Sequence, residues 1–163
     1  TAVFGVLNYS VEAENLDRAL RASYNQQIEF YKNYRLLLQF GNFRVQENGN
    51  RVVWTISNSD ASTIIALYLQ KEAKINTSAE KLYIECANEN YEYRFFARDH
   101  YQSEIEASLY PQEPECYNIS GDALKWAGIS LVEQYSGNGY RDGMRVLGDF
   151  SSRLYIIKKV EVK

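Results

Sequence analysis

Histidine and cysteine are scarce in this sequence. Its 163 residues include one histidine, His100, and two cysteines, Cys86 and Cys116, and no CxxC pair occurs. A zinc site usually takes about four such ligands, so we expect no metal and no other cofactor. No GxSxG or comparable nucleophile motif accompanies His100. The sequence therefore predicts a protein that is not an enzyme, and an enzyme that uses His100 is the alternative.

Positive charge is also in short supply. The chain has 18 Lys and Arg against 21 Asp and Glu, a formal net charge of -3, and its basic residues are scattered singly or in pairs. Binding to a phosphate backbone needs a clustered basic surface, so we expect no nucleic-acid partner. There are only 2 prolines, and no Pro-, Gly- or Ser-rich linker divides the chain. This composition is typical of one globular unit.

Tyrosine, in contrast, is abundant, with 14 copies. It is common in strands and at interfaces, because a large apolar ring carries a polar tip. Tyr91, Tyr93 and Phe95 alternate with polar residues, which places them on one face of a strand. Core packing is the commoner explanation for such a stripe, and a surface that stacks on a sugar or contacts a partner is the alternative interpretation.

Residues 10–40 predict one amphipathic helix. Apolar side chains recur along it at spacings of three and four, at Ala13, Leu16, Leu20, Tyr24, Ile28, Tyr31, Tyr34 and Leu38. Ser10 can cap its start, and Gly41 can end it. Such a helix is on the order of 45 Å long. We therefore expect an N-terminal helical region, 1–40, and an antiparallel β domain, 41–163.

Beyond Gly41 the apolar pattern takes a period of two. Residues 42–57 predict a hairpin around Asn48 and Gly49, residues 62–70 a third strand, and residues 81–98 a second hairpin. Further strands are expected in later segments, at 103–110, 123–135, 143–150 and 152–162. Of these, residues 124–135 fit a helix as an alternative.

The first seven residues, TAVFGVL, form an apolar run that is too short to span a bilayer, which takes about 20 apolar residues. We interpret this run as the end of a longer apolar helix with a membrane anchor upstream. The alternative is a segment that packs against the core. In the first interpretation, anchoring or subunit assembly uses Val3, Phe4, Val6, Leu7, Leu16, Leu20, Tyr24, Ile28 and Tyr31.

Two features agree with an exported protein. A disulfide between Cys86 and Cys116 would close a loop of about 30 residues and contribute roughly 3 kcal/mol, with two free thiols as the alternative. Asn8, Asn76 and Asn118 stand in N-x-S/T triplets, which are glycosylation sites in exported chains but also arise by chance.

The order of these elements resembles the archaeal branch of the type IV pilin superfamily. In that family an apolar strand, a polar turn and another apolar strand follow an N-terminal helix and open a β-sandwich. The corresponding residues here are 52–56, 58–62 and 64–69, although Asp60 replaces the usual turn glycine. The resemblance implies an extracytoplasmic, membrane-tethered subunit without enzymatic activity.

The sequence thus predicts an α+β fold in which a long N-terminal amphipathic helix precedes an antiparallel β-sandwich. Its predicted role is that of a pilin-like structural subunit at the cell surface, tethered to the membrane and packed against copies of itself or other pilin-like subunits. An extracellular module that binds carbohydrate or a protein partner through the aromatic sheet face is the alternative.

Overall fold

The structure is a computed structural model that describes residues 2–10, 14, 16–72, 81–97, 116–130, 149–150 and 152–160. Its helical elements are η1 (Ala2–Phe4), α1 (Arg18–Phe40) and η3 (Ala123–Ala127). Its strands are β1 (Asn42–Asn48), β2 (Arg51–Ser57), β3 (Thr63–Gln70), β4 (Lys81–Leu82), β5 (Glu92–Ala97), β6 (Cys116–Ser120), β7 (Ile129–Ser130) and β8 (Ser152–Lys159).

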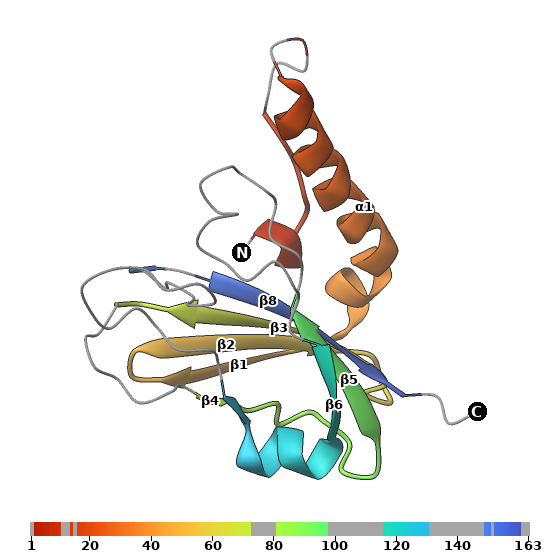
Figure 1. Ribbon diagram of the computed structural model, residues 1–163, viewed down its shortest axis with the longest axis vertical. Coiled ribbons are helices and arrows are strands. Elements are labelled where there is room, and N and C mark those ends of the chain that lie inside the picture. The colour runs from red at the N-terminus through yellow and green to blue at the C-terminus, as the bar shows by residue number, and fades with distance from the viewer. Residues whose placement is uncertain are drawn as a thin grey trace.

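Six of these strands form one antiparallel sheet in the order β1-β2-β3-β8-β5-β6 (Figure 1). The first three strands form a meander, as the sequence pattern indicates. The fourth position belongs to β8, which pairs with β3 on one side and with β5 on the other. A separate two-stranded sheet joins β4 to β7.

The first hairpin follows directly from its turn residues and is confirmed. Asn48 of β1 faces Arg51 of β2, and Gly49 in the turn between them has a φ of 56°. A residue without a side chain adopts this left-handed conformation at no steric cost. The predicted third strand, β3, is confirmed as well.

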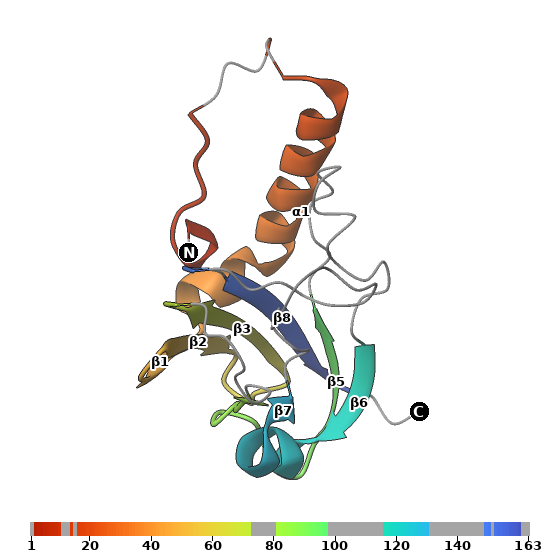
Figure 2. The same cartoon turned by 60° about the vertical axis from the view of Figure 1, so that its left-hand side comes forward.

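Helix α1 is shorter than the sequence pattern predicts. Asp17 is its N-cap and accepts a hydrogen bond from the Leu20 amide at 2.7 Å, so the helix begins at Arg18 and not near Ser10. It ends at Phe40, where the Gly41 amide bonds the Leu37 carbonyl at 2.8 Å. A side chain on Gly41 would lie 2.6 Å from that carbonyl oxygen. Only the C-terminal part of α1 meets the sheet, and the rest projects beyond it (Figure 2).

The core lies on both faces of the sheet. On one face, Phe30 and Leu38 of α1 pack against Ile56, Ile65 and Ile156. On the other, Leu82, Leu124 and Ile129 from β4, η3 and β7 close over a second cluster of strand residues, which includes Ile64 and Ile157. Because neighbouring residues of a strand point to opposite faces, β3 contributes Ile64 to one cluster and Ile65 to the other. Strands β3 and β8 are therefore buried on both sides.

The predicted fold class is wrong. In the part of the chain that the structure describes, one six-stranded sheet stands between α1 and the layer of η3, β4 and β7, and no second large sheet completes a sandwich. The predicted second hairpin is wrong too, because β4 pairs with β7 whereas β5 pairs with β6 and β8. Turn-like residues between two β-rich segments do not decide which strands pair when more distant partners compete.

The first residues do not continue a helix into α1. Residues 2–4 form the short turn η1, and Val3 and Phe4 pack against the cluster under α1, which is the alternative that the sequence left open. Among the described residues, none of the helices is both long enough and apolar enough to cross a bilayer.

Candidate functional site

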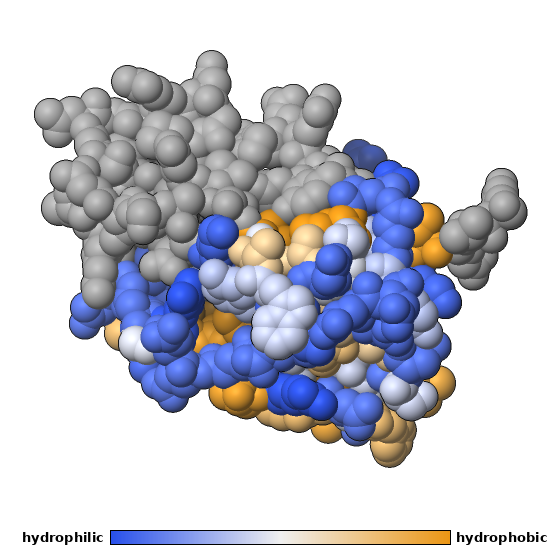
Figure 3. Space-filling model, turned by 90° about the horizontal axis from the view of Figure 1, so that it is seen from below, coloured by the Kyte–Doolittle hydropathy of each residue, from blue (hydrophilic) through white to orange (hydrophobic). Residues whose placement is uncertain are grey.

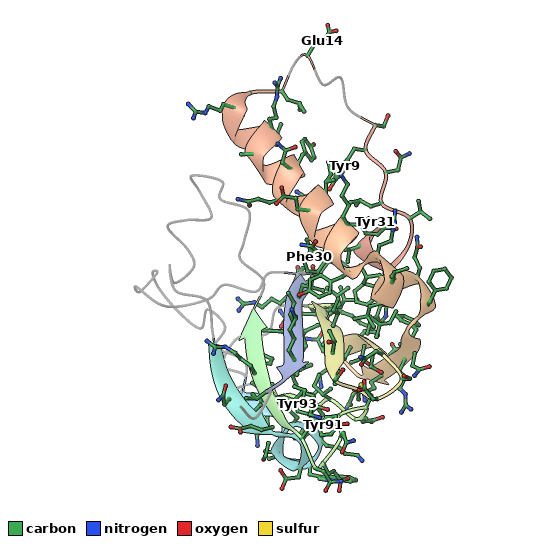
Figure 4. All side chains as sticks on the ribbon, turned by 90° about the vertical axis from the view of Figure 1, so that its right-hand side faces the viewer. Tyr9, Glu14, Phe30, Tyr31, Tyr91 and Tyr93 are labelled. Atoms are coloured by element: carbon green, nitrogen blue, oxygen red, sulfur yellow. The ribbon has the colours of Figure 1, made fainter. Side chains whose placement is uncertain are left out.

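The aromatic face of β5 packs in the core, which is the commoner explanation of its sequence pattern, and it is not an exposed binding surface. Tyr93 and Phe95 are fully buried in the larger core cluster, and Phe95 stacks on Tyr155 with ring centroids 4.9 Å apart. Tyr91 is half-buried, with the Lys159 ammonium 3.8 Å from its ring centroid. Tyr91 and Tyr93 lie at the end of the sheet away from α1 (Figure 4). These three side chains therefore do not form an exposed binding surface.

Tyr93 instead joins two loops. Its hydroxyl donates to the Ala61 carbonyl at 2.9 Å and accepts from the Asn88 amide at 2.9 Å. Burial raises the pKa of this phenol. The residue thus connects the β2–β3 turn to the segment before β5, which is a structural role.

Trp126 is an exposed aromatic side chain that contacts polar groups. It lies in η3 with 69% of its surface exposed, and its indole N–H donates to Glu89 at 3.2 Å. The Lys125 ammonium donates to the same carboxylate at 2.8 Å and lies 5.1 Å from the Trp126 ring centroid. The surface seen from this end of the molecule is mainly hydrophilic, with hydrophobic side chains between the polar ones (Figure 3). An aromatic ring fixed beside a carboxylate and an ammonium can stack on a sugar and bond its hydroxyls.

Every described carboxyl group with a shifted pKa is shifted downward. The hydrogen bond from Lys125 lowers the pKa of Glu89, that from Lys71 lowers the pKa of Glu47, and bonds from Ser62 and Ser120 lower those of Asp60 and Asp122. A general acid needs a raised pKa instead. Nor do the described residues contain a group of three or more His, Cys, Asp or Glu side chains that could hold a metal.

A hollow of about 490 Å³ lies between α1 and the segment that precedes it. Its walls include Tyr9, Leu16, Tyr24 and Ile28, together with polar side chains such as Arg21. Tyr9 and Tyr24 meet edge to face with ring centroids 4.8 Å apart, and Tyr9 donates to Gln27 at 2.6 Å (Figure 4). The segment before α1 thus covers part of the helix face that was proposed for assembly, at Tyr24.

The remaining predicted residues are spread over the molecule. Val6, Asn8 and Leu20 are exposed, and Tyr31 donates to the Gly5 carbonyl at 3.1 Å. Asn118 is exposed on the edge strand β6, and Asn76 lies outside the described residues, as does His100. Glycosylation and a location outside the cell stay predictions.

The two cysteines are on different elements. Cys86 is partly buried, burial raises the pKa of its thiol, and no described side chain forms a disulfide with it. Cys116 is the first residue of β6. The Cys116 side chain is outside the described part of the structure, so the disulfide is untested.

Comparison with known proteins places the chain among the glycosyl hydrolases. It belongs to the glycosyl hydrolase family 36 C-terminal domain, whose family model matches residues 51–157.

Its relatives are α-galactosidases. The chain is 27% identical to α-galactosidase AgaA of Geobacillus stearothermophilus over 164 aligned positions, which cover 98% of this chain and 18% of that enzyme. The structure of AgaA in complex with raffinose matches 98% of the chain with a TM-score of 0.70 at 24% identity. The α-galactosidase of Lactobacillus brevis matches 99% of the chain, and 19% of its own, with a TM-score of 0.73 at 23% identity. The chain thus spans about a fifth of these enzymes.

These matches overturn the functional prediction. The resemblance to type IV pilins is wrong, and so are the non-enzymatic assignment, the pilin-like partners and the membrane tether, because the family is a glycosyl hydrolase family. A strand, a polar turn and a second strand after a helix occur in many folds, which is why the resemblance misled.

Proposed function

We propose that this chain is the C-terminal β domain of an α-galactosidase and that it supports the catalytic part of that enzyme. The observation that carries the proposal is the similarity to AgaA along 98% of the chain, together with the family match.

The role proposed for the domain itself is structural. Glycoside hydrolysis generally uses two carboxyl groups, of which the acid has a raised pKa. The described carboxylates with shifted pKa values, such as Glu89, are held ionised by surface hydrogen bonds. The chain matches 18% of AgaA, which leaves the rest of that enzyme to hold its catalytic pair.

The test begins with the protein that carries this sequence in its native source. We expect its intact mass to exceed 18.9 kDa several-fold and the protein to hydrolyse p-nitrophenyl α-galactopyranoside but not the β anomer. The 163-residue chain alone should hydrolyse neither. Hydrolysis by the chain alone, or none by the longer protein, would contradict the proposal.

Carbohydrate binding by the domain is a second candidate, favoured by the exposed Trp126 ring beside Glu89 and Lys125. Titration of the chain with raffinose should then change its tryptophan fluorescence, and Trp126→Ala should abolish the change. Trp54, the other tryptophan, is a partly buried internal reference. An unchanged signal at millimolar sugar would remove this candidate.

A further inference from the structure

The backbone that carries Trp126 is firmly held. Trp126 belongs to η3, the short cyan coil that lies at the end of the molecule away from α1 (Figure 1). Leu124 of η3 is fully buried, and its carbonyl accepts a hydrogen bond from the Ile84 amide at 3.0 Å. The Gly128 amide ends the element by donating to the Ala123 carbonyl at 2.9 Å. The backbone is thus fixed on both sides of an exposed indole ring, as a preformed binding site requires.

The orientation of the ring is fixed as well. The indole N–H donates to Oε1 of Glu89 at 3.2 Å. The Lys125 ammonium donates to the same oxygen at 2.8 Å and lies 5.1 Å from the ring centroid. These contacts restrict the rotation of the side chain before a ligand arrives, which lowers the entropic cost of binding. We call Trp126, Glu89 and Lys125 the tryptophan site.

Two lysines and two carboxylates lie at η3. Lys81 donates to the Ala127 carbonyl at 3.1 Å, Lys125 is bonded to Glu89, and Asp122 is the N-cap of the element. The four charges cancel. A neutral ligand rich in hydroxyl groups matches such a mixed surface more closely than a phosphate does, since a phosphate needs clustered positive charge.

The tryptophan site can both accept and donate hydrogen bonds. The two bonds to Glu89 both go to Oε1, which leaves Oε2 to accept from a ligand. The hydrogen bond from Lys125 lowers the pKa of Glu89, so this carboxylate is ionised at neutral pH. The Lys125 ammonium carries further hydrogens besides the one that Glu89 takes, so it can donate to a ligand. Two neighbouring hydroxyl groups on one ligand fit this arrangement.

We infer that the tryptophan site binds a terminal galactosyl residue. The inference rests on the second candidate function, carbohydrate binding, and names its sugar. The axial hydroxyl at carbon 4 of galactose leaves the C–H groups of carbons 3, 4 and 5 together on one face, and an apolar face of this kind stacks on an indole ring. The hydroxyls of carbons 3 and 4 can then bond Glu89 and Lys125. Glucose, whose hydroxyl at carbon 4 is equatorial, does not present the same three C–H groups on one face.

Nuclear magnetic resonance of the 163-residue chain tests the inference. The chain has two tryptophans, Trp54 and Trp126, and therefore two indole N–H signals. Methyl β-galactopyranoside should shift the Trp126 signal at millimolar concentration, whereas the signal of the partly buried Trp54 should not move. Methyl β-glucopyranoside, which differs only at carbon 4, should bind at least about tenfold more weakly. Equal binding of the two sugars, or a shift with neither, would overturn the inference.

Matched variants assign the binding to the tryptophan site. Saturation transfer to the protons of methyl β-galactopyranoside should disappear in Trp126→Ala, and Glu89→Gln should weaken binding at least about fivefold. Glu47→Gln is the control, because Glu47 is also an exposed carboxylate bonded to a lysine, Lys71, but lies on β1. Binding that survives Trp126→Ala, or that falls equally in the two glutamine variants, would contradict the inference.

The anomer of the probe separates this inference from the enzymatic assignment. Stacking involves carbons 3 to 5 and not the anomeric carbon, so the site should bind a β-galactoside that the proposed enzyme does not hydrolyse. Binding by the chain, without hydrolysis of p-nitrophenyl α-galactopyranoside by the longer native protein, would support the tryptophan site and refute the enzymatic assignment. Hydrolysis by the longer protein without binding by the chain would do the reverse.

Discussion

Tyr93 shows how one side chain fixes two distant turns. Its ring is buried among strand residues, and its hydroxyl is bonded both to the Ala61 carbonyl and to the Asn88 amide. Ala61 has a φ of 57°, which is rare for a residue with a side chain, so its turn benefits from an outside hydrogen bond.

Removal of that hydroxyl should be costly. Tyr93→Phe leaves the Asn88 amide and the Ala61 carbonyl, both partly buried, without this partner, and we expect a loss of about 1–3 kcal/mol in the free energy of unfolding. Urea denaturation at pH 8 measures it. Tyr91→Phe is the control, because that ring is only half-buried, and a similar loss there would contradict the assigned role of Tyr93.

The stability of the wild-type chain relative to Tyr93→Phe should also depend on pH. Burial raises the pKa of the Tyr93 phenol, so the folded state holds the proton more tightly than the unfolded state. The associated stability is complete below the unfolded pKa of about 10 and is lost as pH rises further. The stability difference between wild type and Tyr93→Phe should therefore shrink as the pH rises above about 10. A constant difference across that range would show that the phenol is not buried.

Gly121 is a second residue with a defined steric role. A side chain there would lie 1.9 Å from the Asn88 carbonyl oxygen, and its amide bonds the Tyr91 carbonyl at 2.8 Å. Because the obstacle is backbone, Gly121→Ala should destabilise the chain by at least about 1–3 kcal/mol, as measured by thermal unfolding. Gly49→Asn is the comparison: that glycine has a positive φ but free space around it, and asparagine tolerates this conformation, so little change is expected.

For single residues, the sequence predicted which side chains share a face but not whether that face is buried. It placed Tyr91, Tyr93 and Phe95 on one face of a strand, but alternation alone does not tell a core face from a binding face. That distinction depends on η3 and β4, two separate segments whose residues cover the same face. Trp126 was overlooked as a surface residue because it occurs in a segment whose secondary structure the sequence left open.

Among the elements, α1 should be the first to detach. A small cluster around Phe30 and Leu38 holds it on the sheet, and its first turns project beyond. Phe30→Ala removes a 9% exposed ring from this cluster, which should cost about 3 kcal/mol of helix docking.

Circular dichroism distinguishes local from global loss. In Phe30→Ala the helical signal at about 222 nm should melt before the sheet, and exchange in α1 should accelerate while β3 stays protected. Leu36→Ala, which changes an exposed side chain of the same helix, should stay within about 0.5 kcal/mol of wild type. A single, unchanged transition in Phe30→Ala would show that α1 and the sheet unfold as one unit.

Elements that depend on neighbouring residues could be predicted from the sequence. Strand pairings that depend on residues far apart in the chain could not. The β1–β2 hairpin follows from Asn48 and Gly49, and the general position of α1 from its apolar spacing. The start of α1 was placed too early because the cap was assigned to Ser10, whereas Asp17 is the residue that caps the helix. The partners of β4 and β5 could not be assigned, since they lie in β7, β6 and β8.

The whole molecule depends on β8. This strand contributes Tyr155 and Ile157 to one core cluster and Ile156 to the other, and it bridges β3 and β5. A chain shortened to residues 1–150 should therefore lack the cooperative unfolding transition of the full chain, as followed by far-ultraviolet circular dichroism. Removal of residues 161–163 alone is the control and should leave the transition in place. A cooperative transition in the shorter chain would show that β1, β2 and β3 suffice for folding.

The position of β8 also determines when, during synthesis, the sheet can be completed. Strands β1 to β3 leave the ribosome early and can pair at once, but β5 and β6 have no place in the sheet until residues 152–159 arrive between them and β3. During this interval the inner edges of β3 and β5 are open, and open strand edges are sites of aggregation. A chain that stops before residue 152 would thus hold two separate half-sheets, so the domain completes its sheet only once β8 has been made.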